Sequence, residues 1–288
     1  MRIILVGDTA GVEQLLRFVP RANVVALLGA AIRPQYLPEL ESIAARLGVS
    51  LLVQPKRGAD EYAAFVNRVV DLEADLLWAN SYSMILREDL LASVRLGAVN
   101  IHAALLPHNR GCNPTQWAII NGDGESGVTL HEVSEGVDEG PIIDQRRLPL
   151  FFEDTWQTVR ARLMRASDEL IAANLPAILS GRWVARPQDE AVASSGRRRT
   201  PEDGLFDWSQ PVVSIYNHIR ALLPPLPPAF FVDPDGRKVV MEHYLRPAEV
   251  AMLKYGRLGG QVMQAGRVRL RPLQPSDGPL LYEWITNR

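Results

Sequence analysis

The sequence predicts an α/β fold with a mostly parallel sheet, followed by a small β domain. Over residues 1–180, short apolar runs alternate with longer stretches whose apolar residues recur every three or four positions. A stretch with the composition of an exposed connector follows, "SSGRRRTPEDG" at residues 194–204. Short β-rich runs lie beyond it. The alternation predicts βαβ units with right-handed crossovers, and the later short runs predict antiparallel strands.

Runs of branched apolar residues predict the strands of the first part at 2–6, 23–29, 50–53, 75–79 and 98–102. Helical spacing predicts the helices between them at 11–19, 38–48, 60–72 and 87–97. Binding sites in parallel sheets lie at the carboxyl ends of the strands. The fifth strand ends at His102, so we expect a site there.

The later elements are predicted in the same way. A helix, two strands and a long helix complete a first domain of residues 1–190, at 115–122, 126–133, 140–150 and 156–179. A second domain, residues 200–265, begins with a helix that Pro224 and Pro225 end. Short antiparallel strands follow at 229–233, 238–245, 260–266 and 267–273. Residues 266–288 are predicted as a C-terminal extension.

Charge and cysteine content exclude several classes of protein. The chain has 31 Lys and Arg against 33 Asp and Glu, a formal net charge of -2, so no global basic field draws it to nucleic acid or an anionic membrane. No stretch approaches the ~20 apolar residues of a membrane span, and the run at residues 3–6 is too short for a signal peptide. Cys112 is the only cysteine, which excludes an internal disulfide and fits a reducing cytoplasm.

Several isolated motifs have a simpler structural explanation. "GDTAG" at residues 7–11 lacks the Gly-x-Gly-x-x-Gly pattern of dinucleotide-binding loops and is predicted as a plain turn. Cys112 has no assignable base and is predicted as a small buried thiol. His131, within an alternating strand, is predicted to be a hydrogen-bonded packing residue. The histidines lack ligand spacing, so no metal is expected.

Asn100 and His102 stand apart because both lie on one face of the fifth strand, while Val99 and Ile101 point into the fold. Asp138 follows in a glycine-flanked turn that could bring a carboxylate beside the imidazole. Spacing alone leaves two roles open for Asp138, a turn cap or a third member of the site.

Residues 99–144 contain Asn-x-His, Leu-Leu-Pro-x-x-Arg-Gly, Gly-Val-Thr-x-His and Asp-x-Gly-x-Ile in register, the first written "VNIHAALLPHNRG" and the last "DEGPII". This pattern resembles the folate-dependent formyltransferase family, whose type member acts on methionyl-tRNA. The resemblance implies a Rossmann-like catalytic domain and a small open, OB-like β barrel. It also implies that Asn100, His102 and Asp138 are catalytic and that 10-formyltetrahydrofolate is the formyl donor.

The chemistry of formyl transfer explains these residue types. Asn100 would donate to the oxyanion of a tetrahedral intermediate, His102 would move a proton from the amine to the leaving nitrogen, and Asp138 would orient the imidazole and stabilise its protonated form. By the same resemblance, folate would lie along two segments that include Ser81, Tyr82, Ser83, Met84, Ile85, Leu86, Val133 and Val137. No metal or nicotinamide is required.

The acceptor is predicted to be a nucleotide-linked amino sugar, and the nucleotide would serve as a handle. The segment at residues 28–48 is short and nearly neutral, whereas tRNA-specific members of the family carry a long basic insertion there. Arg110, Asn113 and Trp117 are candidate substrate contacts. Arg110 bracing its own loop and Trp117 lying in the core remain equally open.

Three other functions remain as alternatives: a methionyl-tRNA formyltransferase, a deformylase that uses water, and a nonenzymatic or nicotinamide-dependent protein. Residues 267–288 are similar to the first strand and helix of a GNAT acetyltransferase, which suggests a longer fusion, although the same residues could end the β domain. We expect a cytoplasmic enzyme that binds neither nucleic acid nor membrane, and the sequence leaves a homodimer open.

Overall fold

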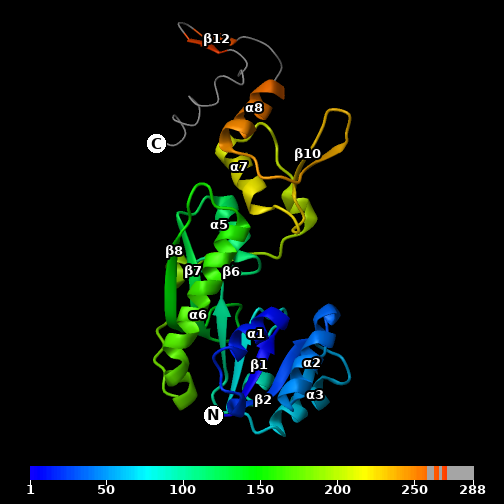
Figure 1. Cartoon of the computed structure of the whole chain (residues 1–288), viewed down its shortest axis with the longest axis vertical. Helices are drawn as coiled ribbons and strands as arrows, with labels where there is room; N and C mark the ends of the chain where they lie inside the picture. Colours follow the sequence, from blue (N-terminus) through cyan, green and yellow to red (C-terminus); the bar gives the residue numbers. More distant parts are fainter. Residues whose placement is uncertain (258–262, 266–267, 271–288) are drawn as a thin grey trace. The chain divides into compact units, whose positions relative to one another are not determined.

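The computed structural model describes residues 1–257, 263–265 and 268–270 (Figure 1). The chain forms two compact units. The first contains residues 1–114, 125–149 and 161–196, and the second contains residues 115–124, 150–160 and the described residues from 197 onward. The second unit therefore takes in two short segments from within the predicted catalytic domain.

The first unit is built on a seven-stranded sheet of order β3-β2-β1-β4-β5-β7-β8. Strands β1 to β5 pair in parallel, and β7 and β8 continue the sheet as an antiparallel hairpin. The mostly parallel sheet is thus confirmed. The strands are β1 (Ile3–Gly7), β2 (Val24–Ala30), β3 (Ser50–Gln54), β4 (Leu76–Asn80), β5 (Ala98–His102), β7 (Glu125–Glu132) and β8 (Ile142–Pro149).

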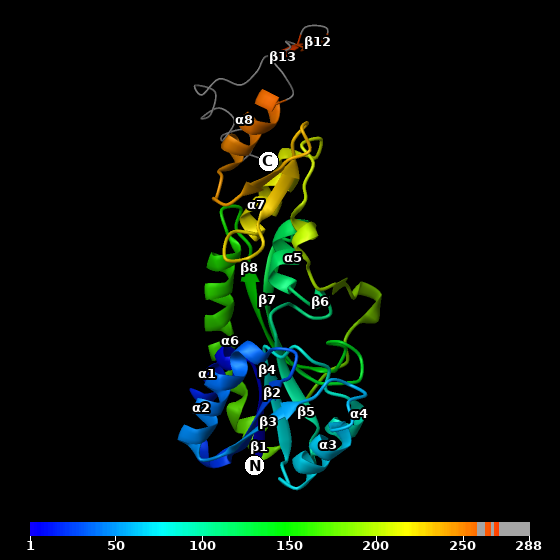
Figure 2. The ribbon, with the colours of Figure 1, turned by 90° about the vertical axis from the view of Figure 1, so that its right-hand side faces the viewer.

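Helices cover both faces of this sheet. Figure 2 shows α1, α2 and α6 on one side and α3 and α4 on the other. Alternate strand residues supply the two cores, because successive side chains of a strand point to opposite faces. Ile4 and Val6 pack with Phe65 and Val69 of α3 on one face. The helices are α1 (Thr9–Leu16), α2 (Leu37–Leu47), α3 (Tyr62–Val70), α4 (Glu88–Leu91) and α6 (Trp156–Ser180), with short 3₁₀ turns at η1 (Arg21–Asn23), η2 (Pro34–Tyr36) and η3 (Glu190–Val192).

Helix α4 is shorter than the predicted helix at residues 87–97, which was wrong beyond residue 91. The chain turns back instead, because Leu96 N–H donates to Asp75 O at 2.8 Å and Gly97 adopts a left-handed backbone with φ of 66°. Val94 remains buried in the core although it is not helical.

The stretch at residues 194–204 is mostly exposed, as its composition predicts, but it also contains a short strand that was not predicted. Residues Ser195–Gly196 form β9, which pairs in parallel with β6 (Arg110–Gly111) in the loop that follows β5. Composition predicts whether a segment is polar, but it does not predict whether the backbone of that segment pairs with a neighbouring loop.

The second unit contains antiparallel strands, as predicted, arranged in two separate two-stranded sheets. Helix α8 was not predicted; of its residues, Val250 and Ala251 are fully buried and give only a narrow apolar stripe. The elements are α5 (Pro114–Asn121), η4 (Pro201–Gly204), α7 (Val212–Ala221), β10 (Ala229–Val232), β11 (Lys238–Met241), α8 (Pro247–Arg257), β12 (Met263–Ala265) and β13 (Val268–Leu270). Most of the C-terminal extension, on which the acetyltransferase prediction rests, lies outside the described residues.

Candidate active site

The end of β5 places Asn100 and His102 on one face, as alternation predicts, while Val99 and Ile101 are buried. The neighbouring antiparallel strand β7 sets His131 directly opposite Asn100. The Asn100 amide Nδ2 donates to His131 Nε2 at 3.1 Å, and His131 Nδ1 donates to the carbonyl oxygen of Glu132 at 2.7 Å. The second bond assigns the Nδ1 proton, so Nε2 is the acceptor for Asn100.

Asp138 reaches this pair from the loop between β7 and β8. Its backbone is left-handed, with φ of 56°, which is uncommon for a residue with a side chain. One carboxylate oxygen lies 3.4 Å from His102 Nδ1, and the other lies 3.5 Å from His131 Nε2. Gly111 N–H donates to the Asp138 carboxylate at 2.8 Å. The structure therefore brings Asn100, His102 and Asp138 together.

The protonation states follow from burial and from these contacts. Burial of the imidazole lowers the pKa of His102, and the Asp138 carboxylate opposes part of that shift. Burial would raise the pKa of Asp138, but the nearby imidazoles of His131 and His102 and the hydrogen bond from Gly111 N–H together lower it to about 2. At neutral pH the site holds a neutral His102 beside an ionised Asp138.

His102 is oriented from its other side by the loop that follows β5. Its Nε2 lies 2.9 Å from the carbonyl oxygen of Asn109, so this nitrogen is the donor. Nδ1 then carries the lone pair of the neutral ring and faces Asp138. A proton taken up at Nδ1 would lie beside a carboxylate, which stabilises the imidazolium.

The three candidate substrate contacts have different surroundings. Arg110 is only 4% exposed, and its guanidinium donates to the side chains of Gln188 and Glu190. These contacts favour the bracing role over a substrate contact. Asn113 is half-buried with a left-handed backbone, φ of 58°. Trp117 belongs to the second unit, where its indole N–H donates to Arg197 O at 2.9 Å.

The predicted folate segment follows β4 and begins with Ser81, whose φ is 57°. Gln54, at the end of β3 and 3% exposed, accepts from the Tyr82 hydroxyl at 2.7 Å and donates to Ile85 O at 3.1 Å. Leu86 is buried. Ile85 is 47% exposed and Val137 is 50% exposed. Val133 packs against the core from the other predicted segment.

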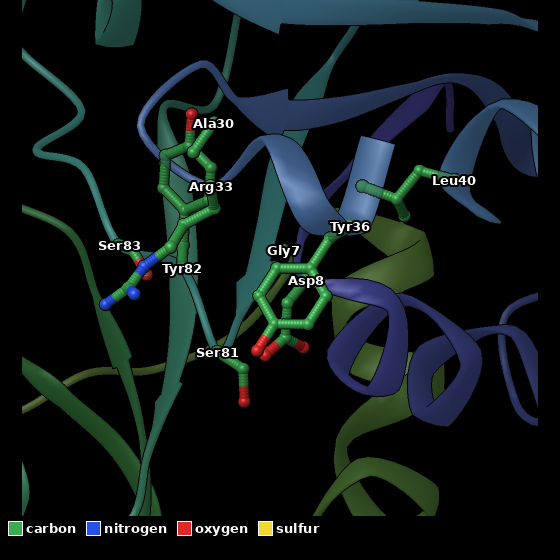
Figure 3. A pocket seen from close by; sticks show the side chains of 9 residues that line it. All are labelled: Gly7, Asp8, Ala30, Arg33, Tyr36, Leu40, Ser81, Tyr82 and Ser83. Atoms are coloured by element: carbon green, nitrogen blue, oxygen red, sulfur yellow. Dashed lines mark hydrogen bonds between the residues drawn. The ribbon is translucent and has the colours of Figure 1, made fainter. Parts of the chain in front are cut away.

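Two adjacent hollows lie beside this segment. One opens at the carboxyl ends of β1 and β4, with the Arg33 side chain donating to Ser83 Oγ at 3.3 Å (Figure 3). Its lining is Gly7, Asp8, Ala30, Arg33, Tyr36, Leu40, Ser81, Tyr82 and Ser83. The second is lined by Ile32, Gln54, Arg57, Tyr62, Ser83, Met84, Ile85 and Arg87. Ser83 and Met84 of the predicted folate segment thus face open space.

His131 is buried and hydrogen-bonded, as predicted, but sequence reasoning missed that it contacts both Asn100 and Asp138. The strand register that pairs it with Asn100 could have indicated this. Gln188, which contacts Arg110 and the Asp138 loop, carries no signal in a single sequence. Among the described residues no cluster of His, Cys, Asp and Glu could hold a metal ion, and none of the described helices is long and apolar enough to span a membrane.

Comparisons with solved structures agree with this fold. A Mycobacterium tuberculosis protein described as a candidate sugar N-formyltransferase shares 26% identity over 85% of this chain and 98% of its own, with a TM-score of 0.64. A sugar N-formyltransferase from a Shewanella species shares 21% over the same proportions, with a TM-score of 0.68. An N-formyltransferase from Helicobacter canadensis, solved with folinic acid and dTDP-3-aminofucose, shares 18% over 77% of this chain and 80% of its own, with a TM-score of 0.60.

The family comparison covers both parts of the chain. Residues 21–175 match the formyl transferase family, and residues 198–277 match the formyl transferase C-terminal domain. The first match alone spans more than half of the 288 residues and includes the Asn100, His102 and Asp138 cluster. The chain belongs to the formyl transferase family, as its motifs predicted.

Proposed function

We propose that this formyltransferase moves the formyl group of 10-formyltetrahydrofolate to the amine of a nucleotide-linked amino sugar. The observation that carries the reaction is the meeting of Asn100, His102 and Asp138 at the end of β5, with the Asp138 carboxylate between two imidazoles. These three groups supply what acyl transfer to an amine needs: an oxyanion donor, a neutral base and a charge that stabilises the protonated base.

Asn100 would stabilise the developing oxyanion. The amine nitrogen attacks the formyl carbon and a C–N bond forms, which leaves negative charge on the formyl oxygen. One hydrogen of the Asn100 amide is directed to His131 Nε2 and the other is left for that oxygen. Because the amide is already held by His131, its donor is preorganised, and a donor of this kind is worth ~3 kcal/mol in the transition state.

His102 would carry the proton. Its neutral ring accepts a proton from the attacking amine, and Asp138 stabilises the resulting imidazolium. The same proton then passes to N10 of the departing tetrahydrofolate as the old C–N bond breaks. The proton count balances, because the amine loses one hydrogen and the folate nitrogen gains one.

The residues around the predicted folate segments suit such a donor. Exposed Ile85 and Val137 offer apolar surface to a flat ring, and the Ser134 hydroxyl is buried without a hydrogen-bond partner among the described residues. Arg57 and Arg87 line the second hollow, beside Met84 and Ile85, where they could pair with the glutamate carboxylates of a folate.

Two observations support the amino-sugar acceptor. The solved structures that resemble this chain include two described as sugar N-formyltransferases and an N-formyltransferase that holds a dTDP-linked amino sugar. The segment between β2 and α2 contains only one 3₁₀ turn and no basic insertion that could hold a tRNA. A diphosphate and base would supply binding energy that holds the amine near the formyl carbon.

An acceptor panel tests the proposal. The enzyme is given 10-formyltetrahydrofolate with a set of nucleotide-linked amino sugars, with methionyl-tRNA, or with no amine, and formylated product and free formate are measured. We expect kcat/KM for at least one amino sugar to exceed that for methionyl-tRNA by about 100-fold or more, the scale on which oriented binding acts. Formylation of methionyl-tRNA alone, or formate release that needs no amine, would refute the sugar assignment.

A further inference from the structure

The segment from Gln188 to Gly196, which we call the strap, crosses the catalytic loops of the first unit. It follows α6 and includes the 3₁₀ turn at Glu190–Val192 and strand β9. None of it belongs to the seven-stranded sheet. Its contacts reach both sides of the His102 and Asp138 pair.

On the Asp138 side the contacts come from Gln188. Its amide nitrogen donates to the carbonyl oxygens of Asp138 and Gly140, both at 2.7 Å. Its amide oxygen accepts two bonds from Arg110, at 2.8 and 3.1 Å. Glu190 pairs with the same guanidinium at 2.7 Å. Gln188 therefore links the Asp138 loop to the loop that follows His102.

On the His102 side the contacts come from Ser194 and β9. Ser194 Oγ accepts from Asn109 N–H at 2.9 Å, and Asn109 O is the acceptor for His102 Nε2. The Ser194 backbone adds a bond from its N–H to Pro107 O and one to its carbonyl oxygen from Arg110 N–H. Cys112 N–H donates to Gly196 O at 3.0 Å. Ser194 is thus hydrogen-bonded directly to Asn109, the residue that orients the His102 imidazole.

The strap contacts two residues, Asp138 and Asn109, whose backbone conformations need support from their surroundings. Asp138 and Asn109 both adopt left-handed conformations, with φ of 56° and 57°. Residues with a Cβ hold such conformations where surrounding contacts determine them. The backbone of each is bonded to a side chain of the strap: Asp138 O accepts from Gln188, and Asn109 N–H donates to Ser194 Oγ.

We propose that Gln188 and Ser194 are positioning residues for catalysis: Gln188 holds the Asp138 carboxylate, and Ser194, through Asn109, holds the His102 ring. Neither side chain touches the reacting atoms in this arrangement. The proposal rests on the catalytic roles given above for His102 and Asp138.

The test compares Gln188→Leu and Ser194→Ala with matched substitutions away from the site. Gln157→Leu removes another glutamine bond to a carbonyl, in the second unit, and Ser180→Ala removes a serine bond at the end of α6. We expect kcat to fall about 30-fold in Gln188→Leu and about 5-fold in Ser194→Ala, because sub-ångström misplacement of a reacting group is costly. The two control variants should keep the wild-type kcat.

Two further measurements separate positioning from general damage. In the Asp138→Asn background, Gln188→Leu should cost less than 3-fold further in kcat, because the group it positions is already gone. The His102 imidazole, titrated by NMR in the free enzyme and assigned with His102→Asn, should move in Gln188→Leu toward its pKa in Asp138→Asn. This titration needs no acceptor, so it still decides the role of Gln188 if every amino sugar fails.

Three outcomes would overturn the proposal: wild-type kcat in Gln188→Leu, a full additive loss in the double variant, or a His102 titration identical to that of wild type. Gln188→Glu covers the case in which Gln188→Leu does not fold. It keeps the acceptor for Arg110 and loses the donor to Asp138 O, so it must show the same kcat loss and the same shift in titration.

Discussion

The two loops expected to meet the folate donor are held in place by different parts of the chain. The loop at residues 81–86 is held by Gln54, which lies at the end of β3 and is almost fully buried inside the sheet region. The loop that carries Asp138 is held by Gln188, from a strap outside any large sheet. In both cases a glutamine amide donates to a loop carbonyl. The proposed folate-binding loop is thus held by a residue of the central sheet, whereas the proposed catalytic loop is held by a segment that follows α6 in the sequence.

The largest expected effect comes from the catalytic side itself. His102→Asn and Asp138→Asn should each lower kcat by at least about 100-fold, because positioned acid–base groups contribute that much. Circular dichroism and thermal melting check that each variant folds. Turnover close to wild type in His102→Asn would refute the proposed mechanism, and the Asp138 loop would then have no catalytic role to distinguish it from the loop at residues 81–86.

Asn100→Ala should lower kcat by about 100-fold, the equivalent of ~3 kcal/mol, while the KM for the donor changes little. The reason is that its hydrogen bond strengthens only as the oxyanion forms. Steady-state kinetics with varied 10-formyltetrahydrofolate makes the measurement. An effect seen only in KM would mean that Asn100 binds the folate donor and does not stabilise the oxyanion.

The pH dependence reports on His102. Its pKa is lowered by burial, so the neutral base persists below the usual value of 6.5. We expect kcat/KM to fall with pH only below about 6.5 and then to drop about 10-fold per unit, because each unit removes nine-tenths of the neutral imidazole. A rate profile gives the midpoint. A midpoint clearly above 6.5 would mean that a different group titrates, or that Asp138 outweighs burial.

Gln54→Leu sharpens the comparison from the donor side. Removing its bonds to Tyr82 and Ile85 should raise the KM for the folate donor about 5-fold and change kcat less than 2-fold, on the scale of one or two hydrogen bonds. Gln188→Leu should show the opposite pattern. If both variants lowered kcat and left KM unchanged, the proposed division, with donor binding at residues 81–86 and catalysis at the Asp138 loop, would be wrong.

Two changes, Cys112→Ser and treatment with a chelator, are expected to leave kcat unchanged. Cys112→Ser should leave kcat unchanged, because the contact of Cys112 with the strap is made by its backbone N–H and not by its thiol. Prolonged treatment with a chelator should also leave kcat unchanged, since no metal enters the proposed chemistry. A loss of turnover with the chelator that zinc restores would contradict the second statement.

Much of the sheet and of the helices around it could be predicted, because the spacing of apolar residues along the sequence differs between strands and helices. Alternation along β5 placed Asn100 and His102 on one face, and the hairpin after it brought Asp138 near them. Helix α8 was not predicted because its apolar stripe is narrow. The turn after α4 was predicted as helix because the apolar residues of 87–97 have helical spacing, and Val94 is buried there without being helical. Gln188 was missed for a different reason: its bonds to the Asp138 loop are made to backbone carbonyl oxygens, which every residue has and which the sequence therefore does not reveal.

The course of the strap also bears on how enzymes of this kind can be cut and recombined. A fragment that ended at residue 190, the boundary that the sequence predicts for the first domain, would keep Gln188 and lose Ser194 and β9. A chimaera that exchanges the C-terminal part for that of a relative therefore needs its junction after Gly196. Placed earlier, the junction would pair the loop at Arg110–Gly111 with a foreign strand, and an exchange intended to alter only the second unit would change catalysis.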